Sequence, residues 1–112
     1  MATGDDLRRI ALALEGASEA PHFDRLAFRV ARIFATLAPD RLTANFMFTP
    51  DEQEFKCLTA PEAFRPVPGG WGRNGATTAI LAALSEDELR AALEMAWRRA
   101  LPKPRAGRTG KR

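Results

Sequence analysis

The chain has 112 residues, and its content of 46% hydrophobic and 28% charged residues is typical of one globular domain. The single cysteine, Cys57, excludes an internal disulfide bond and is compatible with a reducing compartment. No apolar run approaches the roughly 20 residues that a membrane span needs, and the N-terminus has no signal-peptide pattern. We therefore expect a cytoplasmic protein without a membrane partner.

Basic residues gather near the C-terminus. Residues 98–112 contain seven lysines and arginines and no acid, so the rest of the chain carries a net charge of −4 although the whole carries +3. We expect a single domain over residues 1–102, followed by a basic disordered tail over residues 103–112. The tail could supply phosphate contacts to a nucleic acid, or it could be only a solvated segment.

The first half of the chain predicts one helix and three strands. Thr3 and Asp6 have the spacing of a capping box, and apolar residues at helical spacing then predict a helix over residues 4–15, which Gly16 ends. After Pro21 the hydrophobic period changes to two, which indicates an antiparallel meander. Its strands are expected at residues 26–30, 33–37 and 42–48.

The next segments are a short helix, a loop and a third apolar run. A capping pattern begins a helix over residues 51–58, in which Phe55 and Leu58 can face inward. Residues 61–75 are rich in proline and glycine and predict a long loop. Residues 76–84 are compatible with a strand or a helix, and their two threonines favour the strand.

The last element is the clearest helix of the chain. Ser85 and Glu88 have capping-box spacing, and a long amphipathic stripe follows until Pro102 stops it. The resulting order, α-β-β-β-α-β-α, predicts the α+β class. We expect a single domain with an antiparallel sheet and both terminal helices packed on one face.

The loop contains a glycine pattern. Residues Gly70 to Gly75 match the G-x-G-x-x-G pattern of dinucleotide-binding loops, which needs a strand before it and a helix after it. Here a Pro-rich loop precedes the pattern and an expected strand follows, so we favour a loop whose glycines permit positive φ angles. Trp71 and Arg73 could stack on a base and contact a phosphate, but we favour a packing role in which Trp71 covers the core.

Residues that could carry catalysis or metal binding are few. His22 is the only histidine, and with Cys57 it supplies two metal ligands at most, without the spacing of a zinc site. Acid–base catalysis by His22 would need a partner such as Asp24. Lys56 could lower the pKa of the neighbouring Cys57 thiol. We predict no catalytic residue, no cofactor and no metal site, and the residues do not favour an enzyme.

Six segments together resemble the MmcQ/YjbR family, over about residues 4–103. They are residues 21–24 (PHFD), 26–30 (LAFRV), 33–37 (IFATL), 71–77 (WGRNGAT), 96–98 (AWR) and 101–103 (LPK). The resemblance implies an α+β fold similar to frataxin-like and double-wing domains, in a family commonly labelled DNA-binding by analogy of fold. It also implies a recurrent surface made of His22, Phe28, Arg29, Trp71, Gly72 and Arg73.

Two functional hypotheses follow. The first is a non-catalytic binding module for nucleic acid, and the family resemblance implies that this nucleic acid is DNA. Its expected binding residues are Arg29, Arg32, Trp71, Arg73 and His22. The second is a protein-interaction or small-ligand-sensing domain that uses the Pro/Gly-rich loop over residues 66–75 as its contact surface. The sequence predicts neither the specificity of the partner nor the oligomeric state.

Overall fold

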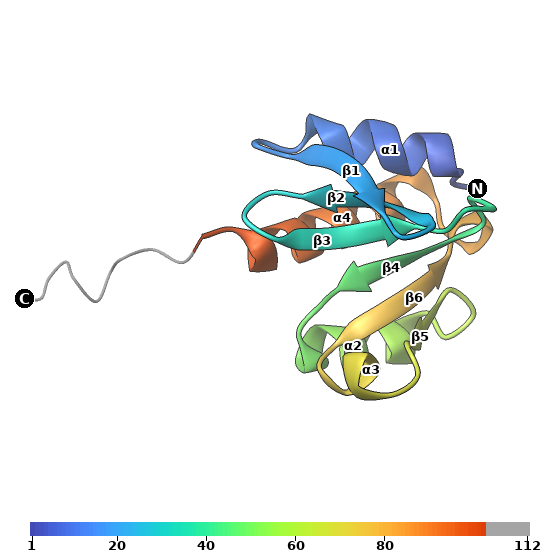
Figure 1. Cartoon of the computed structure of the whole chain (residues 1–112). Helices are drawn as coiled ribbons and strands as arrows, with labels where there is room; N and C mark the ends of the chain where they lie inside the picture. Colours follow the sequence, from blue (N-terminus) through green and yellow to red (C-terminus); the bar gives the residue numbers. More distant parts are fainter. Residues whose placement is uncertain (103–112) are drawn as a thin grey trace, which may run out of the picture.

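A six-stranded antiparallel sheet in the order β1-β2-β3-β4-β6-β5 forms the centre of the fold, in a computed structural model that describes residues 1–102 (Figure 1). The strands are β1 (Ser18–His22), β2 (Arg25–Arg29), β3 (Ile33–Leu37), β4 (Thr43–Met47), β5 (Phe64–Pro66) and β6 (Ala76–Ile80). The helices are α1 (Gly4–Ala13), α2 (Pro50–Thr59), α3 (Gly70–Arg73) and α4 (Glu86–Ala100), with a 3-10 turn at Leu81–Ala83. The predicted α+β class is confirmed, and the predicted tail over residues 103–112 lies outside the described residues.

Capping boxes begin the three longer helices. Thr3, Thr49 and Ser85 each accept a hydrogen bond from the backbone N–H three residues later, and the acid at that position accepts one from the backbone N–H of the cap. These bonds satisfy N–H groups that the first turn of a helix leaves without partners. The helix starts that the sequence predicts are therefore confirmed.

Helices α1 and α4 cover one face of the sheet, and Figure 1 shows α4 behind the strands with α1 along the β1 side. The register aligns Phe28, Ala35 and Phe46 across β2, β3 and β4, and cross-strand partners share a face. All three are fully buried in one cluster with Leu7 of α1 and Leu89 of α4. The core therefore lies between this face and the two terminal helices.

Strands β1 and β5 and the short helix α3 were not predicted from the sequence. β1 and β5 are the two edges of the sheet, and they contain Pro21 and Pro66. Proline cannot donate a ladder hydrogen bond, so it breaks a sequence pattern but is tolerated on an edge strand. The strand expected over residues 76–84 is β6, which ends at Ile80 and is followed by the 3-10 turn.

Helix α2 does not bury the two side chains that the sequence suggested. Phe55 is 58% exposed and Leu58 is 74% exposed. Cys57 and Ala60 pack against the core instead, so the inward interpretation of Phe55 and Leu58 is wrong. In a helix of ten residues with few apolar positions, the sequence pattern does not determine which side faces the core. Packing of α2 on β5 and β6 determines it.

An ion pair ties the edge strand β1 to α1. Nε and Nη2 of Arg8 donate to the two carboxylate oxygens of Glu19 at 2.8 and 2.7 Å. These hydrogen bonds lower the pKa of Glu19, so the pair stabilises the fold while Glu19 is ionised and loses this effect as the pH falls through the lowered pKa. We expect Glu19→Gln to lower the urea midpoint at about pH 7, and this difference from wild type to shrink towards about pH 3.

The control for this prediction is Glu15→Gln. Glu15 is exposed and takes part in none of the ion pairs formed within residues 1–102, so its replacement should move the midpoint little at either pH. A loss for Glu19→Gln that stays the same at both pH values would contradict the role of the ion pair.

Candidate functional site

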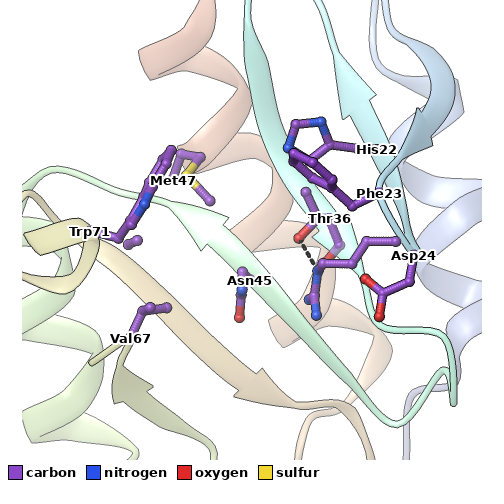
Figure 2. A pocket seen from close by; sticks show the side chains of 10 residues that line it. His22, Phe23, Asp24, Thr36, Asn45, Met47, Val67 and Trp71 are labelled. Carbon is purple, nitrogen blue, oxygen red and sulfur yellow. Dashed lines mark hydrogen bonds between the residues drawn. The ribbon is translucent and has the colours of Figure 1, made fainter. Parts of the chain in front are cut away.

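The face of the sheet opposite α1 and α4 carries a pocket of about 250 Å³. Figure 2 shows the β1–β2 turn on one side of it and the segment leading into α3 on the other. The turn contributes His22, Phe23 and Asp24, and the segment contributes Val67 and Trp71. The floor comes from strand residues, namely Arg25, Thr36, Asn45, Met47 and Ala76. Two loops far apart in the sequence therefore meet over the middle of the sheet.

A row of polar side chains crosses this face. The register aligns Thr36, Asn45, Thr78 and Arg65 across β3, β4, β6 and β5, and we call these four residues the polar row. Nε of Arg25 donates to Oγ1 of Thr36 at 2.8 Å, and Oγ1 of Thr78 donates to Oδ1 of Asn45 at 2.8 Å. These bonds hold the floor of the pocket in a defined arrangement.

Trp71 is presented to solvent by a firmly anchored helix. Its side chain is 70% exposed, whereas the neighbouring Gly72 packs so closely that a Cβ there would lie 1.6 Å from the carbonyl oxygen of Val67. Nε2 of Gln53 in α2 donates to the carbonyl oxygens of Gly72 and Ala76, both at 2.9 Å. The indole ring therefore projects from a backbone that α2 and β6 fix in place.

The glycine pattern serves this anchoring and is not a phosphate loop. Strand β6 follows it, where a dinucleotide fingerprint requires a helix. Gly75 has a φ angle of +111°, and a Cβ there would lie 2.0 Å from the carbonyl oxygen of Phe48. The pattern thus marks close backbone packing around α3, together with one position that needs a positive φ angle.

Phe23 forms the other aromatic wall, with an exposed side chain and an unusual backbone conformation. Its ring is 93% exposed, and its backbone has a φ angle of +59°, a region that a bulky residue rarely occupies. The ring of His22 packs against it edge to face, with centroids 4.8 Å apart. An apolar ring held in solvent by a strained turn is more typical of a binding residue than of a folding requirement.

The structure brings together only part of the residue set predicted for binding. His22 and Trp71 line the same pocket, whereas Arg73 lies in α3 but does not line it. Arg29 is exposed at the opposite end of β2 from the pocket residue Arg25. Nη2 of Arg32 donates to the backbone oxygen of Arg99 at 3.1 Å, which places Arg32 at the C-terminal end of α4. The favoured packing role for Trp71 is wrong, because its ring stays exposed.

The pocket residues that the sequence did not assign to binding include Phe23, Arg25 and Asn45. Arg25 was placed outside the strand, which begins one residue earlier than expected. Asn45 alternates with Ala44 and Phe46, whose side chains are buried in the core, so its side chain lies on the opposite face. Only the convergence of the two loops, which a single sequence does not reveal, turns that polar position into part of a pocket.

Other chemistries find little support in this part of the chain. Within residues 1–102, no group of three or more His, Cys, Asp and Glu side chains is placed to hold a metal ion. Burial raises the pKa of the Cys57 thiol, contrary to the lowering suggested by the adjacent Lys56. Over the same residues, no helix has both the length and the apolar composition needed to cross a bilayer.

The fold and the pocket define a small α+β domain with its helices on one face of the sheet and a loop-walled pocket on the other. Residues 12–99 match the family model described as YjbR, so the chain belongs to the YjbR family. The crystal structure of the Deinococcus radiodurans protein DR2400, which contains the DUF419 family-model domain, is similar in fold. Its TM-score is 0.71 at 22% identity, and the match covers 86% of this chain and 76% of that one. No curated protein matches the chain.

Proposed function

We propose that this chain is a non-catalytic module that binds single-stranded nucleic acid across the face opposite α1 and α4. The observation that carries the proposal is the pair of exposed aromatic rings, Phe23 and Trp71, on two walls of one pocket. Aromatic rings next to arginine are the usual means of holding unpaired bases, because every base has a face on which to stack. Arg25 lies on the pocket floor between the two loops.

The distribution of arginines supports this assignment. In the part of the chain that the structure describes, the arginines that form ion pairs with acids are Arg8, Arg9, Arg41 and Arg90, and their partners lie in α1, β1 and α4. Strands β2 to β6 contain three further arginines and no acid. These are Arg25, Arg29 and Arg65, and none of them forms an ion pair with an acid within residues 1–102.

A net negative charge on the body of the chain would disfavour nucleic-acid binding, but the acids do not lie in strands β2 to β6. The net charge of −4 over residues 1–97 arises from acids in the helices, the turns and β1, and Glu19 of β1 is paired with Arg8. The sheet itself supplies positive charge to the pocket side. A phosphate backbone that crosses the sheet would meet arginines that form no ion pair with an acid within residues 1–102.

We expect Trp71→Ala to weaken binding of an oligonucleotide of about 12 nucleotides by about tenfold, since loss of one stacked base costs about 1–3 kcal/mol. The unfolding midpoint should change little, because the ring is exposed. Fluorescence anisotropy over a salt series measures the affinity. Phe55→Ala is the matched control, since it removes another exposed aromatic ring from α2, outside the pocket. Wild-type affinity in Trp71→Ala would contradict the proposed surface.

A full-length variant separates the pocket from the basic tail. Replacing the five lysines and arginines of residues 103–112 by glutamine should lower the affinity and reduce its salt dependence, because fewer counterions are released. The further loss caused by Trp71→Ala should persist in this background. Binding that disappears with the tail charges alone would assign the affinity to a non-specific polycation rather than to the folded domain.

A small planar ligand is the second candidate, and the concave, mostly apolar pocket between loop 66–75 and the β1–β2 turn favours it. The two candidates differ in how affinity depends on length and salt. A strand that crosses the sheet should bind more tightly as it is lengthened and less tightly as salt rises, whereas a small neutral ligand should show neither effect.

A further inference from the structure

The floor of the pocket offers hydrogen-bond donors more than acceptors. Nε of Arg25 donates to Oγ1 of Thr36 at 2.8 Å, and its Nη2 donates to the backbone oxygen of the same residue at 3.4 Å. A guanidinium has five N–H groups and no acceptor, so its remaining donors are available to a ligand. The hydroxyl oxygen of Thr36 already accepts the bond from Arg25, which leaves its hydrogen free to donate.

Asn45 also offers a hydrogen-bond donor to a ligand. Its side-chain oxygen accepts a hydrogen bond from the hydroxyl of Thr78 at 2.8 Å, so the amide NH₂ is the group left over. Asn45 and Arg25 both line the floor, and Figure 2 shows Asn45 between the two aromatic walls. The groups in the lining that can accept, Asp24 and His22, are exposed on the β1–β2 turn at the rim.

We infer that the pocket selects a keto base, meaning thymine, uracil or guanine, from the strand that it binds; the inference rests on the proposed function. A base that stacks between the aromatic walls turns its polar edge towards the floor. Thymine and uracil carry a carbonyl oxygen at C4 and guanine carries one at C6, and this oxygen would accept from Arg25 and Asn45. Cytosine and adenine present an amino group at the corresponding position, and this group would face donors and lose its own hydrogen bonds.

The decisive comparison is between oligo(dT) and oligo(dC) of about 12 nucleotides. The two strands have the same charge, so phosphate contacts do not separate them. Thymine also carries a C5 methyl group that cytosine lacks, so oligo(dU), which has the keto group without the methyl, should bind like oligo(dT) if the floor reads the keto group. We expect the full chain to bind oligo(dT) at least about fivefold more tightly, because one mismatched donor–acceptor edge gives discrimination of this order.

Asn45→Asp tests which side chain reads the base. The substitution keeps the size and still accepts from Thr78, but it replaces the free amide donor by an acceptor. We expect the ratio of oligo(dT) to oligo(dC) affinity to fall to about one or to invert. Asn74→Asp adds the same charge next to Trp71, outside the pocket lining, and should weaken both strands while leaving the ratio unchanged.

The outcomes distinguish the proposed base selection from the proposed nucleic-acid binding on which it rests. Equal affinity of the wild type for both strands, with binding still dependent on Trp71, overturns the base selection and leaves the nucleic-acid function standing. A preference that survives in Asn45→Asp overturns the role of Asn45 in the selection. Absence of binding to either strand overturns the proposed function and the inference with it.

Discussion

Gly72→Ala should reduce the free energy of unfolding by roughly 3 kcal/mol, the upper range for overpacking a rigid site. The added Cβ would lie 1.6 Å from the carbonyl oxygen of Val67 and 2.8 Å from its carbonyl carbon. Val67 cannot retreat easily, since its backbone N–H donates to the carbonyl oxygen of Ala76 in β6 at 3.0 Å. Gln53 holds the other side by its bond to the oxygen of Gly72. The strain must therefore displace α3 or break these bonds.

Gly70→Ala is the matched control in the same short helix. A Cβ at Gly70 would meet nothing closer than Nη2 of Arg73 at 3.5 Å, which is an ordinary contact at the end of a flexible side chain. Alanine also lowers the entropy of the unfolded chain, so this variant should be neutral or slightly more stable. Urea unfolding followed by circular dichroism compares the two. Equal stability of Gly72→Ala and Gly70→Ala would show that α3 is not held as described.

The long, strongly patterned elements could be predicted from the sequence because local signals and tertiary structure agree in them. The capping boxes at Thr3 and Ser85 satisfy helix N–H groups whatever the helices pack against, so their patterns are reliable. The alternation in β4 follows from one buried face. In β1 and β5 the local signal and the tertiary structure disagree. Their prolines argue against a strand, but both strands are edges of the sheet, where proline is tolerated.

The candidate site was harder to predict than the fold. His22 and Trp71 stood out as residue types, and the structure places both on one pocket. Their neighbours Phe23 and Arg25 carry no signal in a single sequence, because their importance depends on a turn that folds back towards a loop some 45 residues later in the chain. The exposure of Trp71 depends on how α3 is held, and Gln53 of α2, 19 residues earlier in the chain, donates to the carbonyl oxygen of Gly72 in a contact that no local pattern contains.

Phe46→Ala should reduce the free energy of unfolding by about 3–5 kcal/mol, because it removes a fully buried ring from a core that cannot collapse onto the cavity. Phe46 stacks on Phe48 with centroids 5.6 Å apart, and it lies in the row with Phe28 and Ala35 under α4. Differential scanning calorimetry should show a large fall in Tm, whereas Phe55→Ala should change stability by only about 0.5 kcal/mol.

The comparison of Phe46→Ala with Phe55→Ala also tests which face of the sheet is packed against the helices. Every claim about the pocket depends on that assignment. Along β4, Ala44 and Phe46 point to the helices, and Asn45 and Met47 point to the pocket. Because side chains alternate with a period of two, a shift of one residue would exchange the two sets and bury the polar row. A mild effect of Phe46→Ala combined with a severe effect of Phe55→Ala would mean that the core lies elsewhere. The donors assigned to Arg25 and Asn45 would then not face a ligand.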